Sequence, residues 1–239
     1  MPTTHDSRYL AFSCTRHDTD ISAFGRLALA AALCVMFTWF PALAMAGQSP
    51  APATTTISTA AAPSTALCAS CHGEHGAGSD VLGTPRLAGM NPEYLAHALS
   101  MFKDGTRASV IMQPVAQRLS PDDMHALATY FSAQHAPLAQ AQHVPSADLI
   151  SAGKRLAESG GVHDVPACFS CHGSSGQGNG ARFPAIAGQP MTFSIARMRE
   201  FQARAKAAPP KPGSMTEVAS RMDDAQIEAS AAFFSVTMP

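Results

Sequence analysis

Apolar residues recur with the period of an α-helix in the first half of the chain. Between Asn91 and Gly105, apolar residues stand three or four positions apart. Asn91-Pro92-Glu93 has residue types preferred at a helix N-terminus, and Gly105 is typical of a helix end. The predicted inward face of this helix consists of Tyr94, Leu95, Ala98, Leu99 and Phe102.

Three further stretches carry similar signals. Ser120-Pro121-Asp122-Asp123 predicts another helix start, followed by inward-facing Met124, Leu127 and Phe131. A helix is also predicted over 149–158, and Asp223 with Gln226 forms a predicted capping box for the last helix. Alanine is abundant while valine and isoleucine are sparse, which favours an all-α fold.

The chain contains an internal repeat. The segment PRLAG at 85–89 is matched by PAIAG at 184–188, and the pair at 130–131 (Tyr-Phe) is matched by Phe-Phe at 233–234. This period is too long for a solenoid, so it predicts a duplicated domain. We expect the first copy at 64–136, a connector at 137–146 and the second copy at 147–239, each a small helical bundle.

The N-terminal part differs in composition from the repeats. Arginines precede an apolar run that ends in the small-x-small pattern Ala44-Met45-Ala46, which predicts a signal peptide over 1–46. The alternative is an uncleaved membrane anchor. Residues 47–63 are rich in Ala, Pro and Thr and are interpreted as a flexible linker. The formal net charge of −1 argues against a nucleic-acid partner.

Each repeat holds one Cys-x-x-Cys-His motif, at 68–72 and at 168–172. Two thiols at this spacing can add to the two vinyl groups of haem, and the histidine that follows can bind the iron. The motifs therefore predict two covalent haem c groups. Their attachment residues are Cys68, Cys71, Cys168 and Cys171, and the proximal iron ligands are His72 and His172.

Other uses of the four cysteines remain open at this point. Two Cys-x-x-Cys pairs could form one Cys₄ zinc site, although a repeated domain should hold its own ligand set. A thioredoxin-like dithiol uses the same spacing, but the βαβ pattern expected around it is absent from the sequence. A structural disulfide within each motif is the third alternative.

Two methionines are candidates for the sixth ligand of each iron. Met112 and Met215 occupy matching positions of the two repeats and are expected in loops before the last helix of each copy. Thioether sulfur suits the iron of an electron carrier. Pro85 and Pro184 follow the histidines at similar distances, and their carbonyl groups are candidate acceptors for the other histidine ring proton. A rigid turn is the alternative role for both prolines.

The paired CxxCHG motifs, the P-x-x-A-G segments, the loop methionines and the closing aromatic helix resemble the two-haem bacterial cytochrome c4 family. The resemblance spans about residues 64 to 239. It implies two tandem class I cytochrome c domains in the periplasm, often at the membrane surface. It also implies redox protein partners: a donor dehydrogenase or quinol oxidoreductase, and a terminal oxidase.

The resulting functional prediction is an electron carrier and not an enzyme, because two six-coordinate irons leave no site for a substrate. Its alternative is an electron-transfer subunit of a larger dehydrogenase or oxidase complex. A di-haem enzyme with an open iron site is a third hypothesis. We also expect a basic stretch to dock an acidic partner. It consists of Arg197, Arg199, Arg204, Lys206 and Lys211.

Overall fold

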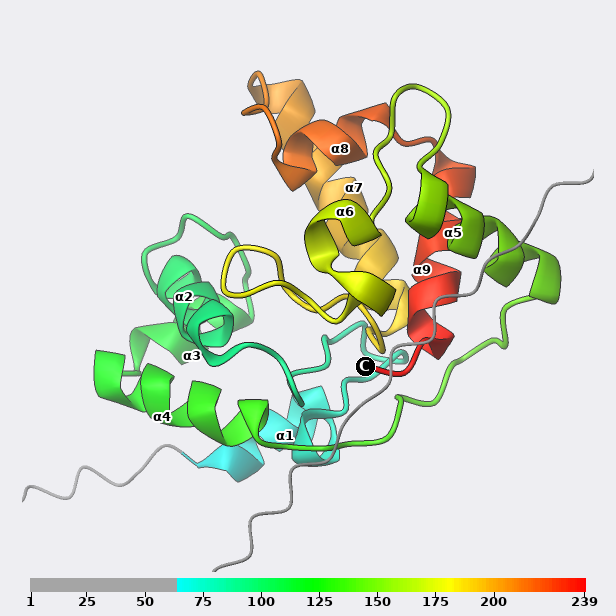
Figure 1. The fold of residues 1–239 in the computed structure, drawn as a ribbon. Coiled ribbons are helices and arrows are strands. Elements are labelled where there is room, and N and C mark those ends of the chain that lie inside the picture. The colour runs from blue at the N-terminus through cyan, green and yellow to red at the C-terminus, as the bar shows by residue number, and fades with distance from the viewer. Residues whose placement is uncertain (1–63) are drawn as a thin grey trace, which may run out of the picture. The chain divides into compact units, whose positions relative to one another are not determined.

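The computed structural model describes residues 64–239. The predicted signal peptide at 1–46 and linker at 47–63 lie outside the described residues. Regular structure within 64–239 is helical, apart from three isolated β-bridges (Figure 1). No helix in this part of the chain has the length and apolar character needed to cross a membrane.

The first repeat is built from five helices, one of them a short 3₁₀-helix. They are α1 (Thr65–His72), η1 (Glu74–Gly76), α2 (Pro92–Lys103), α3 (Met112–Gln117) and α4 (Pro121–Ser132). Both predicted helices of this repeat are therefore present. The core lies mainly between α2 and α4. Its buried members are Met90, Leu95, Ala96, Leu127, Ala128 and Phe131.

The second repeat has the same helix order with one addition at its start. Its helices are α5 (Ala147–Ser159), α6 (Phe169–His172), η2 (Ser174–Gly176), α7 (Met191–Ala207), α8 (Met215–Arg221) and α9 (Asp224–Val236). Helix α5 packs along α9, and the two run side by side in Figure 1. The buried core contains Leu156, Val165, Met222 and Ile227. Within residues 64–239, no helix that corresponds to α5 precedes α1.

Side-chain caps define where the main helices begin. The Asn91 side chain accepts a hydrogen bond from the Tyr94 backbone N–H at 2.9 Å. Ser120 and Asp123 form a reciprocal capping box at the start of α4. Asp223 and Gln226 form the predicted capping box at the start of α9. These bonds satisfy backbone N–H groups that lack a partner inside the helix.

The two repeats belong to one compact unit and are joined by hydrogen bonds. The Asp80 carboxylate accepts from the backbone N–H of Thr192 at 2.9 Å and from its hydroxyl at 2.8 Å. The Gln189 side-chain amide bonds to both backbone groups of Arg86. Asp80, Arg86 and Gln189 are all buried. Buried polar groups that are paired in this way fix the contact between the repeats.

Candidate haem-binding sites

The two cysteine motifs have nearly the same backbone conformation. Each motif ends in a histidine that is the last residue of its helix, α1 or α6, followed by a glycine. The φ angles of Gly73 and Gly173 are 75° and 76°. A Cβ atom on either glycine would lie within 2.8 Å of the carbonyl oxygen of Gly78 or Gly178, respectively. Glycine is therefore required after the histidine, because the chain turns back closely at this point.

Both motif histidines are buried and hydrogen-bonded to a proline carbonyl. His72 Nδ1 lies 2.9 Å from the Pro85 oxygen, and His172 Nδ1 lies 2.7 Å from the Pro184 oxygen. A carbonyl oxygen only accepts, so Nδ1 carries the proton in each ring. Nε2 is then left with its lone pair available for a metal.

The protonation of these histidines suits metal binding. Burial lowers the pKa of both His72 and His172, and the hydrogen bond to the proline carbonyl opposes this effect in part. The neutral imidazole is the form that binds a metal ion. Each ring is therefore held in the ligating tautomer and charge state.

The cysteines do not fit the other roles considered for them. All four are free thiols in the structure. Burial raises the pKa of Cys68 and raises that of Cys168 to about 11. A redox-active dithiol instead needs a lowered thiol pKa. Among residues 64–239, no cluster of three or more His, Cys, Asp or Glu side chains is arranged to hold a metal ion.

The two methionines each begin a short helix, which differs from the loop positions expected from sequence. Met112 is the first residue of α3, and Met215 is the first residue of α8. Both side chains are partly buried. The Ser109 hydroxyl accepts from the Met112 backbone N–H at 3.1 Å. Helices of six and seven residues are too short to show a clear apolar period in the sequence.

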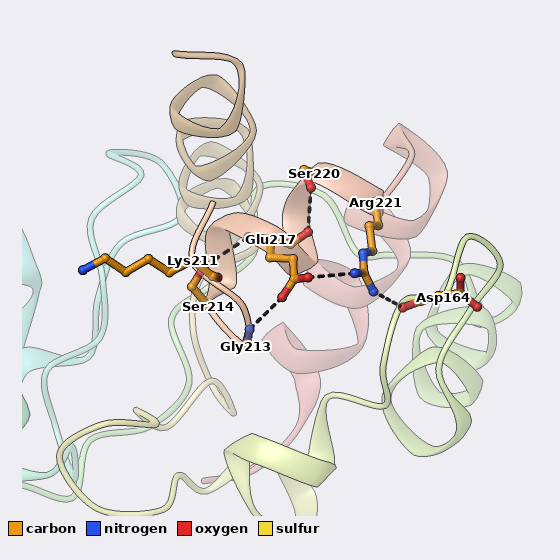
Figure 2. Close-up of polar contacts among 7 residues, drawn as sticks. All are labelled: Asp164, Lys211, Gly213, Ser214, Glu217, Ser220 and Arg221. Carbon is orange, nitrogen blue, oxygen red and sulfur yellow. Dashed lines mark hydrogen bonds and ion pairs between the residues drawn. The ribbon is translucent and has the colours of Figure 1, made fainter. Parts of the chain in front are cut away.

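A polar network fixes the turn that carries Met215 (Figure 2). Glu217 Oε2 accepts from the Gly213 backbone N–H at 2.6 Å, and Oε1 accepts from Arg221 Nη2 at 2.7 Å. Arg221 Nη1 also donates to the Asp164 backbone oxygen at 3.1 Å. The segment before Met215 is thereby tied to α8 and to the loop that follows α5.

The chemistry of each residue set fits a covalently attached haem. Each motif offers two thiols within one turn and a neutral imidazole with a free Nε2. Haem c would be attached through Cys68 and Cys71 in one repeat and through Cys168 and Cys171 in the other. When bound, its iron supplies reversible one-electron transfer.

Sequence reasoning missed the polar residues between the repeats. Arg86 stands in PRLAG where the second repeat has Ala185, and Gln189 stands where the first repeat has Met90. Arg86 directly follows Pro85, and Gln189 directly follows the PAIAG segment that begins with Pro184, so both differences break the repeat within or next to the segments of the proposed proline acceptors. A mismatch in an otherwise matched segment is the sequence signal that could have singled out these two residues. The partner of each residue is visible only in the structure.

The structure also changes the expected basic surface on α7. Glu200 forms ion pairs with both Arg197 and Arg204, and the Arg197 side chain is only 17% exposed. Arg197 also stacks on the Phe201 ring, with its guanidinium carbon 4.2 Å from the ring centroid. The basic stretch is therefore partly neutralised and partly used for packing.

Comparison with known protein families identifies both repeats. Residues 56–131 match the family described as cytochrome c oxidase, cbb3-type, subunit III, and residues 150–236 match the family described as cytochrome c. A thiosulfate dehydrogenase electron acceptor from Thiomonas intermedia is 39% identical over 171 residues, covering 71% of this chain and 78% of that protein.

Two solved structures resemble the chain over similar lengths. Cytochrome c4 from Acidithiobacillus ferrooxidans is 34% identical with a TM-score of 0.62, covering 71% of this chain and 98% of that one. A thiosulfate dehydrogenase from Marichromatium purpuratum is 38% identical with a TM-score of 0.62, covering 71% of this chain and 36% of that one.

The fold and the two motifs define a di-haem class I cytochrome c with two tandem all-α domains. The chain belongs to the cytochrome c4 family. It carries two covalent haem c groups and transfers electrons, and it is not itself a catalytic enzyme.

Proposed function

We propose that His72 with Met112, and His172 with Met215, are the axial ligand pairs of the two irons. The proline hydrogen bonds carry this proposal for the histidines, because they leave Nε2 of each ring free. The assignment of the two methionines as ligands is supported by their matching places in the repeat, because each is the first residue of its short helix. Pro85 and Pro184 orient the imidazoles.

The proposed role in the cell is an exported electron carrier. Residues 1–46 act as the signal peptide, 47–63 as a linker, and 64–136 and 147–239 as the two haem domains in the periplasm. Electrons pass from a donor dehydrogenase or quinol oxidoreductase, through the two haems, toward a terminal oxidase. N-terminal sequencing of the protein from a periplasmic extract tests the export step. A mature N-terminus near Gly47 in that extract supports export with cleavage of the signal peptide. Retention of residues 1–46 in the membrane fraction contradicts cleavage and supports the uncleaved anchor.

A more specific candidate is the electron acceptor of a thiosulfate dehydrogenase. Two relatives carry that description, from Thiomonas intermedia at 39% identity and from Stutzerimonas stutzeri at 35% identity. The similarity covers 78% and 80% of those two proteins, respectively, so it extends over both haem domains. A donor dehydrogenase is among the redox partners that the resemblance to the cytochrome c4 family implies.

Stopped-flow reduction tests this assignment. The oxidised holoprotein is mixed with a thiosulfate dehydrogenase and thiosulfate, and reduction is followed at the haem α-band. We expect reduction of both haems that depends on the enzyme and on thiosulfate. Omission of each component is the control. If the holoprotein stays oxidised while another cytochrome c accepts electrons in the same assay, the donor assignment is wrong.

A further inference from the structure

The peptide group that joins Pro85 to Arg86 is shared between the two repeats. Its carbonyl oxygen accepts the Nδ1 proton of His72 at 2.9 Å. Its N–H donates to the side-chain oxygen Oε1 of Gln189 at 3.1 Å. One peptide therefore connects the proximal histidine of the first repeat directly to a side chain of the second repeat.

Gln189 is held in a single orientation. Its Nε2 donates to the Arg86 backbone oxygen at 3.1 Å and lies 3.4 Å from the Met90 sulfur. Reversing the amide would set its NH₂ group against the Arg86 N–H and its oxygen against the Arg86 carbonyl oxygen. Only the present orientation therefore satisfies both backbone groups. The residue is 4% exposed, so these bonds form away from bulk water.

Arg86 fixes the other side of the contact. Its guanidinium group donates to three backbone carbonyl oxygens: Ala88 at 3.1 Å, Ala136 at 2.7 Å and Pro137 at 2.8 Å. The residue is 3% exposed. The Pro85–Arg86 peptide is therefore positioned from both repeats, independently of the histidine.

The second repeat lacks this arrangement. Met90 occupies the position that corresponds to Gln189, and a thioether is a weak acceptor. Among the hydrogen bonds of residues 64–239, the Ala185 N–H donates to no side chain. The Pro184–Ala185 peptide therefore holds His172 without a polarising partner from the first repeat.

We propose that Gln189 is a positioning residue through which the second repeat lowers the reduction potential of the first haem site. When the N–H of a peptide group donates a hydrogen bond, its carbonyl oxygen becomes a stronger acceptor, because hydrogen bonds in a chain polarise one another. The stronger bond makes the His72 imidazole a more basic ligand. A more basic ligand favours ferric iron, so the electron shared by the two sites moves toward the second repeat.

This proposal rests on His72 as the proximal ligand, and its test separates the two claims. Gln189→Met installs the residue of the matching position and removes the acceptor. Thr192→Val is the matched control, because it removes a hydroxyl bond across the same contact without touching the Pro85–Arg86 peptide. Gln189→Glu retains an oxygen that faces the Arg86 N–H.

The readouts are potentiometric titration of both haems and the proton NMR signal of His72 Nδ1–H in the reduced holoprotein. In Gln189→Met we expect the first site alone to rise in potential. The equilibrium constant for sharing one electron between the two sites should change roughly threefold. This corresponds to a difference of about 28 mV in potential, because a tenfold change for one electron corresponds to about 59 mV. The His72 proton should move upfield. Thr192→Val should change the potential of the first site by less than about a third of that amount. Gln189→Glu keeps an acceptor for the Arg86 N–H, so it should not raise this potential.

Three results would overturn the inference. One is an unchanged potential and unchanged His72 resonance in Gln189→Met. The second is an equal shift in Thr192→Val, which would assign the effect to a loosened contact. The third is a rise in the reduction potential of the first site that is as large in Gln189→Glu as in Gln189→Met. A wild-type spectrum without histidine ligation would instead refute the ligand assignment, whatever the variants show.

Discussion

Gly153 of α5 lies so close to Ala229 of α9 that a Cβ atom on Gly153 would sit 2.0 Å from the Ala229 backbone oxygen. The same atom would be 2.7 Å from Cβ of Phe233. The crossing of the first and last helices of the second repeat therefore depends on the absence of a side chain at position 153. Backbone at this distance cannot move away as a flexible side chain can.

Gly153→Ala should destabilise the second repeat for this reason. Overpacking in a close-packed core costs about 1–3 kcal/mol, which outweighs the helix propensity of about 1 kcal/mol gained by replacing glycine with alanine. Urea denaturation followed by circular dichroism measures the change. Lys154→Ala, on the exposed face of the same helix, should stay close to the wild type. Stabilisation by Gly153→Ala would show that the helices do not cross this closely.

The carboxylate of Asp80 should make stability depend on pH. Burial alone would raise the pKa of Asp80, but hydrogen bonds from Thr192 and Gln142 and the nearby His143 outweigh it and hold the pKa below its ordinary value. A carboxyl with a lowered folded-state pKa stabilises the fold above its unfolded pKa. That stabilisation is lost as the pH falls through the folded pKa.

Asp80→Asn should therefore be less stable than the wild type near about pH 6, and the difference should shrink below about pH 4. Urea midpoints across this pH range measure it. Glu158→Gln, at an exposed pair with Lys154, is the control and should shift the midpoint little. A stability gap between Asp80→Asn and the wild type that is the same at all pH values would contradict the account.

Replacement of either Met112 or Met215 should change one haem site and leave the other haem site unchanged. Met112→Ala should remove the weak far-red band of one ferric haem and lower its potential by on the order of 100 mV, because the thioether favours the reduced state. Met215→Ala should do the same at the second site. Met222→Leu is the control, since Met222 is part of the buried core. Loss of the band in Met222→Leu alone would refute the assignment.

Four of the longer helices (α2, α4, α5 and α9) could be predicted because their signals are local. The starts at Asn91, Ser120 and Asp223 each depend on a cap only three residues from its target. The repeat adds a second check for those helices that both copies share. Local signals of this kind survive folding because tertiary contacts reinforce them.

The relations between distant residues could not be predicted in the same way. Gln189 and Arg86 are read in the sequence as two unmatched residues, and their bond exists only because the repeats pack together. Arg197 and Arg204 appeared as free charges, although Glu200 on the same helix pairs with both. The short helices that begin at Met112 and Met215 have too few turns to show a period.

The most direct test of the central claim is a count of covalent haems together with the ligand signature of each. The full chain is expressed in a host that attaches haem c, and the mature protein is analysed by intact mass and by optical spectroscopy. The account predicts the mass of two haems and a far-red methionine–iron band of the strength expected for two sites. A protein with one covalent haem, or with two haems and no such band, would contradict it.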